Sequence, residues 1–334
     1  MKRYGNLFHK IVDIDNLRLA HKNARKNKTK YKEIIEVDKD SEHYIQEIHR
    51  MLTDGSYRCS KYEKFIKNDS GKEREIFRVP YFPDRIVQHA IMQVVEPIWK
   101  KTLITDTFQA IKGRGVHKCK KKVEKVVQKL GKRYCLQVDV RKFYPSICND
   151  VLKKTVRRKI KCKDTLKLLD QIIEGHEGVP IGNYISQYFG NLVLSDIDHY
   201  CKEVLKTKHY FRYCDDIIVI SDDKDYLHRV RLTIDKLLSD IKLCMKDNYQ
   251  VYKITDNRGV DCFGYTIYPT VTKLRKSIAK AFIKSCTQED NELSLSAYYG
   301  WIKHLPSGIG LWTKGLHNNK SREVKKLTLK MRQL

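Results

Sequence analysis

Acidic residues are far fewer than basic ones in this sequence, and long apolar runs are missing. The 334 residues include 40 Asp or Glu against 67 Lys or Arg. No hydrophobic segment is long enough to span a membrane, and the first residues lack the pattern of a signal peptide. Membrane binding is therefore disfavoured, and we expect a cytoplasmic protein without a membrane partner.

Zinc-type cysteine pairs are also missing. The chain has 10 cysteines, but none stands in a Cys-x-x-Cys pair, the spacing typical of structural zinc sites. Several lie within apolar runs, where cysteine packs as a small core residue. We interpret them as reduced thiols, as in cytosolic proteins.

Positive charge dominates the rest of the composition. The formal net charge is +27, and the Lys and Arg residues are spread along the chain. A broad basic surface favours nucleic acid as the partner, because backbone phosphates supply much of the affinity of such surfaces. The length exceeds one typical domain, and 41% hydrophobic residues allow a sizeable core.

Two adjacent aspartates form the most informative motif. Tyr213-Cys214-Asp215-Asp216 leads into the apolar run at 217–220. Apolar runs on both sides of a tight turn predict a β-hairpin, here with the carboxylates at its tip. Adjacent carboxylates repel each other unless a cation or solvent screens them. The pair indicates a metal site, and the alternative is an ordinary Asp-Asp turn.

A third aspartate ends a strand-like stretch further upstream. Asp139 follows the largely apolar, strand-like stretch 134–138, and the segment 143–145 then turns the chain away from the sheet. Alone, Asp139 would be a cap for the helix expected near Asn149. Paired across a sheet with Asp215, it would complete a carboxylate cluster able to hold two Mg²⁺ ions about 4 Å apart.

A Gly/Pro turn precedes a third informative segment. Residues 178–182 contain this turn, and the small and polar residues after it open an apolar helix. Such a surface lets a nucleotide and a template base approach the backbone closely. Alone, the segment would be a plain junction between a loop and a helix.

Taken in order, these segments resemble the palm of reverse transcriptases. The family order is the strand that ends at Asp139, the helix after Gly182, the YxDD hairpin and a hairpin at 263–265. Upstream, the segments 72–80 and 84–91 resemble the fingers of bacterial reverse transcriptases of the group II intron and retron lineage. The resemblance covers roughly residues 50–280.

The helix block departs from most of that lineage. Ile181-Gly182 stands where most relatives have Gln-Gly, and Ser186-Gln187 stands where they have Ser-Pro. This pattern is similar to the reverse transcriptases of diversity-generating retroelements, whose compact length the chain also matches.

The resemblance implies an α+β fold, a right-hand polymerase with fingers, a ferredoxin-like palm and a small helical thumb. We expect helices on one face of the palm sheet, an amphipathic helix at 226–243, and thumb helices near 276–287, 292–304 and 319–333. The expected division is an N-terminal basic helical segment at 1–50, fingers at 51–130, palm at 131–268 and thumb at 269–334.

The resemblance also implies roles for particular residues. Asp139 and Asp215 would bridge two Mg²⁺ ions, with Mn²⁺ as a possible substitute, while Asp216 would support them and the Val140 carbonyl would complete one ion. Tyr144 stands at the family's steric gate, and the alternative is a core aromatic.

Nucleotide and nucleic-acid contacts follow from the same resemblance. The residue matching Arg74 contacts the triphosphate, and Arg78 lies on the same side of its strand because the two residues alternate with Ile76. The remaining expected contacts are Ile181, Gly182 and Gln187 for the nucleotide, and Lys276, Lys280 and Lys284 for nucleic acid.

The implied function is an RNA-directed DNA polymerase that makes cDNA from a structured template RNA. We expect an error-prone enzyme of a diversity-generating retroelement, encoded by a bacterium or phage. Its partners would be template RNA, a primer or cDNA, deoxynucleoside triphosphates and a small basic accessory protein that forms a ring. The alternatives are an antiphage-defence reverse transcriptase with a dedicated noncoding RNA, and a non-catalytic RNA-binding module.

Overall fold

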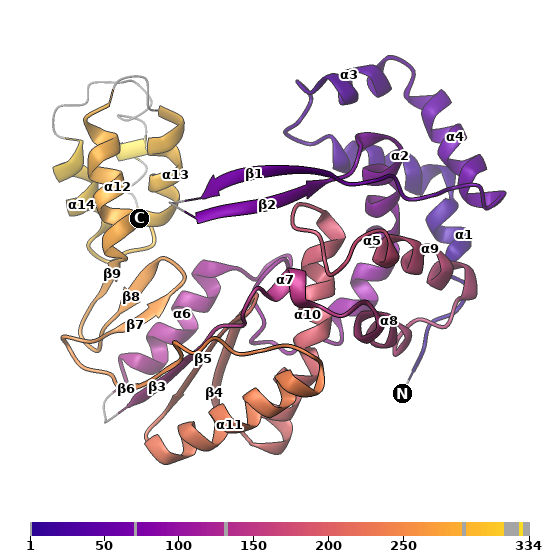
Figure 1. Ribbon diagram of the computed structural model, residues 1–334. Coiled ribbons are helices and arrows are strands. Elements are labelled where there is room, and N and C mark those ends of the chain that lie inside the picture. The colour runs from indigo at the N-terminus through magenta and orange to yellow at the C-terminus, as the bar shows by residue number, and fades with distance from the viewer. Residues whose placement is uncertain (1, 70–71, 130–132, 289–291, 317–326, 330–334) are drawn as a thin grey trace.

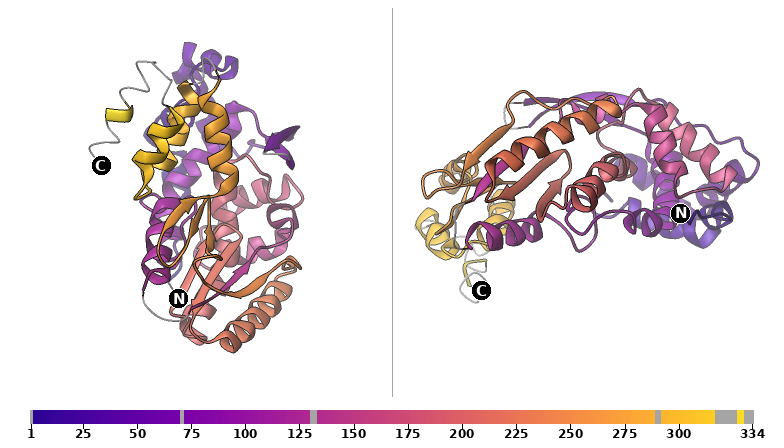
Figure 2. Two further views of the ribbon diagram at one scale, coloured as in Figure 1. Left: turned by 90° about the vertical axis from the view of Figure 1, so that its left-hand side faces the viewer. Right: turned by 90° about the horizontal axis from the view of Figure 1, so that it is seen from below.

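The computed structural model of the protein describes residues 2–69, 72–129, 133–288, 292–316 and 327–329. The N-terminal and C-terminal helices lie on opposite sides of the molecule, with a four-stranded sheet below them in the view of Figure 1 (see also Figure 2). Among the helices of these residues, none is long and apolar enough to cross a bilayer.

Amphipathic helices build the N-terminal part. Their apolar faces bury residues such as Ile45 and Ile91 in one core. The Asp13 carboxylate begins the second helix by accepting the Asn16 N–H at 3.0 Å. These helices are α1 (Phe8–Val12), α2 (Ile14–Ala24), α3 (Lys32–Lys39), α4 (Ser41–Thr53) and α5 (Ile86–Lys100).

A β-hairpin projects from these helices (Figure 1). Strand β1 (Glu63–Asp69) pairs antiparallel with β2 (Lys72–Arg78), and the short π-helical turn η1 (Tyr81–Arg85) follows. The Phe77 N–H donates to the Ile181 carbonyl over 2.8 Å. This bond ties the base of the hairpin to a loop more than one hundred residues further along the chain.

The central sheet has four antiparallel strands in the order β4-β5-β3-β6. The hairpin expected around Asp215 is confirmed, since this residue lies in the turn between β4 and β5. The strands are β3 (Tyr134–Val138), β4 (His209–Tyr213), β5 (Asp216–Ser221) and β6 (Gln250–Lys253).

Helical segments connect these strands. The helix expected at 226–243 is confirmed as α11 (Lys224–Asp240), and it links β5 to β6. The segments between β3 and β4 are α7 (Phe143–Ser146), α8 (Asn149–Arg157), α9 (Lys163–Glu174), α10 (Tyr184–His199) and the π-helical η2 (Tyr200–Val204).

Both faces of the sheet are covered, so the expectation of helices on one face is wrong. Val219 belongs to the core that includes residues of α10 and α11. Its neighbours Ile218 and Ile220 belong to a second core with Val123 of α6 (Val116–Val127). Successive strand residues point to opposite faces, and an uninterrupted apolar strand therefore needs cover on both.

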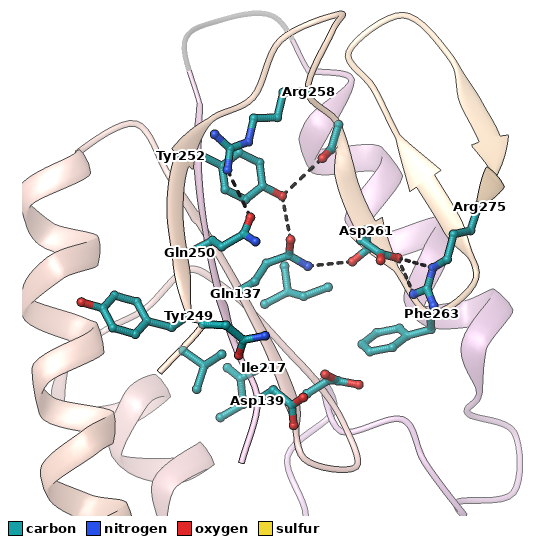
Figure 3. Close-up of a pocket in the computed structure, with 15 residues that line it drawn as sticks. Gln137, Asp139, Ile217, Tyr249, Gln250, Tyr252, Arg258, Asp261, Phe263 and Arg275 are labelled. Carbon is teal, nitrogen blue, oxygen red and sulfur yellow. Dashed lines mark hydrogen bonds and ion pairs between the residues drawn. The ribbon is translucent and has the colours of Figure 1, made fainter. Parts of the chain in front are cut away.

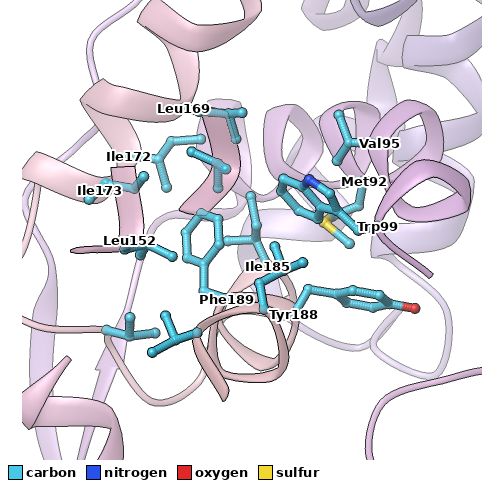
Figure 4. Packing of buried hydrophobic residues seen from close by; sticks show 14 of the residues in the cluster. Met92, Val95, Trp99, Leu152, Leu169, Ile172, Ile173, Ile185, Tyr188 and Phe189 are labelled. Atoms are coloured by element: carbon cyan, nitrogen blue, oxygen red, sulfur yellow. The ribbon is translucent and has the colours of Figure 1, made fainter. Parts of the chain in front are cut away.

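The packing between α5 and α10 fixes the helix that follows the Gly182 loop (Figure 4). Trp99 of α5 is fully buried, and its ring centroid lies 6.0 Å from that of Phe189. Tyr188, also fully buried, contacts the same tryptophan at 6.5 Å. Large buried aromatic side chains of this kind hold the two helices in a fixed relation.

In its described residues, the C-terminal part combines a small sheet with the helices α12 to α14. Helices expected at 276–287 and 292–304 are confirmed, a helix at 308–315 was not expected, and the helix expected at 319–333 lies largely outside the described residues. Phe282 and Trp312 stack at 5.7 Å in its core. The elements are β7 (Val260–Cys262), β8 (Tyr265–Ile267), β9 (Thr272–Leu274), α12 (Lys276–Cys286), α13 (Glu292–Ile302) and α14 (Gly308–Gly315).

Candidate active site

Three carboxylates converge at one end of the central sheet. Strands β3 and β5 pair Val138 with Ile217, which places Asp139 beside Asp216 just beyond the ladder. Asp215, in the turn, is close enough to Asp139 for the two charges to repel each other. The structure therefore brings together the three aspartates that the sequence singled out.

Desolvation and repulsion by neighbouring carboxylates make ionisation of Asp215 and Asp216 unfavourable. Burial and the nearby Asp139 carboxylate raise the pKa of Asp215. Desolvation by the surrounding protein, then the charges of Asp215 and Asp139, raise the pKa of Asp216 to about 7, although the residue as a whole is exposed. A group of carboxylates with raised pKa values is a place where bound cations lower the energy of the ionised form.

A lysine supplies the positive charge that lies nearest to Asp139. The Lys246 ammonium forms an ion pair with the Asp139 carboxylate, and its charge lowers the pKa of Asp216. No three of the described His, Cys, Asp and Glu side chains are arranged to hold a metal ion. The donors are nevertheless the hard carboxylate oxygens that Mg²⁺ prefers, so a cation would compete with Lys246 for Asp139.

The Val140 carbonyl is directed toward the same end of the sheet. Val140 forms an antiparallel bridge with Met245, flanked by bonds from Arg141 N–H to Cys244 O at 2.8 Å and from Lys246 N–H to Asp139 O at 2.9 Å. In such a non-hydrogen-bonded pair, the N–H and C=O of Val140 point away from its partner strand. They therefore face the side of the Asp215 turn.

A pocket of about 420 Å³ links the carboxylates to the small C-terminal sheet (Figure 3). Asp139 lies at one end of it, and at the other the Arg275 guanidinium donates to Asp261 at 2.6 Å. The rings of Tyr213 and Phe263 lie 4.8 Å apart between their centroids. The segment at 263–265 thus contacts the hairpin that carries the aspartates, as its place in the sequence pattern suggested.

Tyr144 lies between α10 and the Asp215 turn. The Cys214 thiol donates to its hydroxyl at 3.4 Å, and a Cβ at Gly190 would lie 3.1 Å from its ring. Burial, and the neighbouring Cys214, raise the pKa of Tyr144. The position is next to the carboxylates, yet the ring also packs against Phe143 at 5.1 Å.

The expected triphosphate contacts lie on the hairpin. Arg74 and Arg78 point to the same side of β2 by strand alternation. Arg78 is already ion-paired, with Glu63 at 2.7 Å and with Glu33 at 3.1 Å. The expectation that Arg74 and Arg78 lie on one side of their strand is confirmed. The guanidinium of Arg78, however, is ion-paired with two glutamates in this structure.

A second cleft, of about 600 Å³, opens between this side of the hairpin and the loop before α3. Arg78 and Gly182 line it, whereas Asp139 and Asp216 line the other pocket. Arg85 lies in this cleft, and partial burial together with Arg78 lowers its pKa. Within the described chain, Arg85 has no hydrogen-bond or ion-pair partner for its guanidinium.

Gly182 occupies a position that requires glycine. Its φ is +126°, and a Cβ would lie 2.8 Å from the Phe77 carbonyl oxygen. The loop and the hairpin base are therefore in direct backbone contact. Ile181 is half-buried in this loop, and Gln187 is exposed on the first turns of α10.

The three candidate nucleic-acid contacts of the C-terminal part share one helix. Lys276, Lys280 and Lys284 recur every four residues along α12 and are all exposed. This spacing places them on one face. They form a short row of positive charge on the surface.

Two candidate functional residues, Lys246 and Arg212, were not predicted from the sequence. Lys246 reads as one of many basic residues in a polar loop, and nothing in its neighbourhood indicates Asp139 as its partner. Arg212 stands in the apolar strand β4, and its side chain is fully buried with that of Asp198. A charged residue inside an apolar strand was the available signal for the second pair.

Comparisons with known proteins agree with this geometry. A family model described as reverse transcriptase (RNA-dependent DNA polymerase) matches residues 66–267. Protein YkfC of Escherichia coli K12 is 30% identical over 153 residues, which are 42% of this chain and 40% of YkfC. The group II intron-encoded protein LtrA of Lactococcus lactis subsp. cremoris is 22% identical over 223 residues, which are 62% of this chain and 36% of LtrA. The chain thus spans about two fifths of the length of these curated relatives.

Two solved structures share the fold. Telomerase from Candida albicans, in complex with a TWJ fragment of telomeric RNA, matches with a TM-score of 0.51 and 11% identity over 84% of this chain and 64% of that chain. Apo telomerase from Candida tropicalis matches with a TM-score of 0.52 and 13% identity over 83% of this chain and 58% of that chain. Both support a right-hand polymerase-like α+β fold. With a family model that covers more than half of its length, the chain belongs to the reverse transcriptase family.

Proposed function

We propose that this chain is an RNA-directed DNA polymerase that extends a primer by nucleotidyl transfer at Asp139, Asp215 and Asp216. The observation that carries the proposal is the convergence of these carboxylates at one end of an antiparallel sheet in a chain of this family. Residues 51–130 act as fingers, 131–268 as palm and 269–334 as thumb, after a basic helical segment at 1–50. The strand order β4-β5-β3-β6 is that of a ferredoxin-like sheet, which supports the palm assignment.

Asp139, Asp215 and the Val140 carbonyl would hold two Mg²⁺ ions, or Mn²⁺, with support from Asp216. When bound, the ions supply activation of the primer 3′-hydroxyl and neutralisation of the departing pyrophosphate. The chain itself holds the carboxylates in place through the β3–β5 ladder. Its contribution to the rate is positioning and electrostatic stabilisation.

The nucleotide lies between the hairpin and α10 in this proposal. Arg74 and Arg78 bind the triphosphate, where a guanidinium fork fits phosphate oxygens, and Arg78 exchanges Glu63 and Glu33 for phosphate. Gly182 allows close approach of the backbone. Tyr144 excludes a 2′-hydroxyl by steric clash and so selects deoxynucleotides.

The nucleic-acid partners are a template RNA and a primer or cDNA strand. The net charge of +27 and the exposed row on α12, Lys276, Lys280 and Lys284, support binding through backbone phosphates. The unpaired Arg85 in the cleft beside the hairpin adds a site for the phosphates of a single strand.

The activity is tested by extension of a DNA primer on a defined RNA template with purified protein. We expect synthesis that requires dNTPs and Mg²⁺, stops with EDTA and depends on the template sequence. Template-independent addition, or no extension with either Mg²⁺ or Mn²⁺, would count against an RNA-directed enzyme.

The biological role that we favour is sequence diversification by a retroelement, with a small basic ring-forming accessory protein, in the cytoplasm of a bacterial host. Its support is the pair of departures at Ile181 and Gln187. A glutamine at 181 would hydrogen-bond near the nascent base pair, whereas isoleucine offers only an apolar surface, and loss of one such bond is worth about 1 kcal/mol of discrimination.

Sequencing cDNA made from one RNA template by the parent protein and by Ile181→Gln tests this role. We expect misincorporation concentrated opposite template adenine in the parent and fewer errors in the variant. Low, base-independent error in the parent would favour an antiphage-defence enzyme that copies a dedicated noncoding RNA.

A further inference from the structure

We propose that Arg212 is a positioning residue that fixes the turn carrying Asp215 and Asp216 by tying it to α10. This inference rests on the proposed polymerase function and concerns a residue that touches neither substrate nor the reacting atoms. Three observations carry it: the complete use of the guanidinium donors, their burial, and the identity of the groups that they reach.

All five N–H donors of the Arg212 guanidinium have acceptors. Two bind the Asp198 carboxylate as a fork, Nε to Oδ1 at 2.7 Å and Nη2 to Oδ2 at 2.6 Å. Two bind Asn191 of α10, Nη1 to the side-chain oxygen at 3.1 Å and Nη2 to the carbonyl at 3.2 Å. The fifth runs from Nη1 to the Cys214 carbonyl at 2.8 Å.

The ion pair itself is buried and fully satisfied. The side chains of Arg212 and Asp198 are both 0% exposed. The Asp198 carboxylate also accepts the Tyr210 hydroxyl at 2.7 Å and the Thr107 hydroxyl at 3.0 Å. A buried ion pair is often no more stable than apolar side chains of the same volume. We therefore infer that this pair fixes the positions of the groups around it and does not act through stability alone.

The backbone of Arg212 is held as firmly as its side chain. The Arg212 N–H donates to the Asp106 carbonyl at 2.9 Å, and the Arg212 carbonyl accepts the Phe108 N–H at 3.0 Å. Cys214, two residues further on, has a left-handed φ of +59°, a conformation that non-glycine residues seldom adopt without support. The bond to its carbonyl supports that conformation and sets the orientation of the peptide that leads into Asp215.

The same guanidinium connects this turn to the helix beside the nucleotide. Asn191 lies on α10, the helix that follows Gly182, and its side-chain NH₂ donates to the Gln109 carbonyl at 2.9 Å. Arg212 is thus the shared point between α10 and the Asp215 turn. Loss of its fork releases the turn from α10 while leaving both elements in the fold.

The test compares three variants with the parent protein. Arg212→Lys keeps the charge, but a single ammonium does not reproduce the planar fork that reaches Asp198, Asn191 and Cys214 together. Asn191→Ala removes one anchor and leaves the ion pair with Asp198 intact. Arg157→Lys, on the more exposed Arg157–Asp170 pair between α8 and α9, is the control for loss of an arginine–carboxylate fork, because that pair lies outside the proposed site.

Two readouts separate positioning from stability. Primer extension, normalised to the concentration of active sites, gives the rate and the half-saturating Mg²⁺ concentration. Hydrogen exchange of the amides at 213–217, without metal or nucleotide, reports the turn itself. We expect Arg212→Lys and Asn191→Ala to lower the normalised rate roughly tenfold, to raise the half-saturating Mg²⁺ several-fold and to speed exchange in the turn.

The control variant shows the result expected of a residue that contributes to stability alone. Arg157→Lys should lower the thermal midpoint without changing the normalised rate, the Mg²⁺ dependence or exchange at 213–217. If Arg212→Lys and Asn191→Ala behave like this control, Arg212 is a structural residue and the inference is wrong. A parent protein that extends no primer would instead refute the proposed function, and the exchange measurement would still decide whether Arg212 holds the turn.

Discussion

Lys246 contacts Asp139 through both its backbone and its side chain. Its N–H donates to the Asp139 carbonyl at 2.9 Å, and its ammonium forms an ion pair with the Asp139 carboxylate. The loop between α11 and β6 thus delivers one positive charge to a cluster of three carboxylates. The Lys246 ammonium is thus paired with the Asp139 carboxylate, which a divalent cation would need as a ligand.

Removal of that charge should strengthen metal binding. In Lys246→Gln, no ammonium competes for Asp139, and an ion pair of this exposure contributes about 0.2–1 kcal/mol. We therefore predict that Mn²⁺ binds roughly 1.4- to fivefold more tightly, measured by EPR titration at constant ionic strength. Lys242→Gln, in the same loop, is the control and should leave the affinity unchanged. Weaker binding in Lys246→Gln would show that the lysine assists the metal site.

The metal-free stability should depend on pH through Asp216. Its pKa is raised in the folded protein to about 7, above its unfolded value of about 3.9. The ionised form therefore costs stability, and this cost is absent below the unfolded pKa and complete above the folded pKa. Asp216→Asn removes it, so the gain in thermal midpoint should be larger at pH 8 than at pH 5, as measured by calorimetry in EDTA.

Asp222→Asn is the control for that measurement. Asp222 is exposed at the far end of β5 and should show no such difference between the two pH values. An equal gain for Asp216→Asn at pH 5 and pH 8 would mean that repulsion in the carboxylate cluster does not limit stability.

Tyr144 should set the preference for deoxynucleotides. Tyr144→Ala removes the ring that would meet a 2′-hydroxyl, and single-nucleotide extension with dNTP or rNTP should then show a loss of discrimination of roughly tenfold or more. Tyr144→Phe keeps the ring and removes the hydroxyl that contacts Cys214 and Gln109, so it should retain discrimination. Unchanged selectivity in Tyr144→Ala would identify this residue as a core aromatic.

The row on α12 should bind phosphates without regard to sequence. Reversing the charge of Lys276, Lys280 and Lys284 to Glu should weaken binding to structured RNA and flatten its dependence on salt, by up to roughly 0.9 in log–log slope for each lost phosphate contact. Fluorescence anisotropy over a range of salt concentrations measures both. Reversal of three other exposed lysines, Lys154 on α8 with Lys163 and Lys167 on α9, controls for net charge, and an equal effect there would remove the assignment of α12.

Local sequence patterns predicted the parts of the site that short segments determine. The hairpin around Asp215 follows from apolar runs on either side of a turn, and the strand before Asp139 from a similar run. Lys246 and Asp139 are 107 residues apart in sequence, and only tertiary packing decides that they meet. Two further features could not be predicted for the same reason: the cover of the second sheet face by α6 and the ion pair of Arg212 with Asp198. A sequence pattern indicates that a side chain is buried, but it does not indicate which residues bury it.

The most direct test of the central claim is extension of a DNA primer on an RNA template by Asp215→Ala. Asp222→Ala removes an exposed acidic residue from the end of β5 and serves as the matched control. Circular dichroism first verifies that both variants are folded. We then predict that Asp222→Ala extends the primer at the rate of the parent protein, and that Asp215→Ala extends it roughly three orders of magnitude more slowly. Extension by Asp215→Ala at the parental rate would contradict the assignment of these carboxylates as the catalytic site.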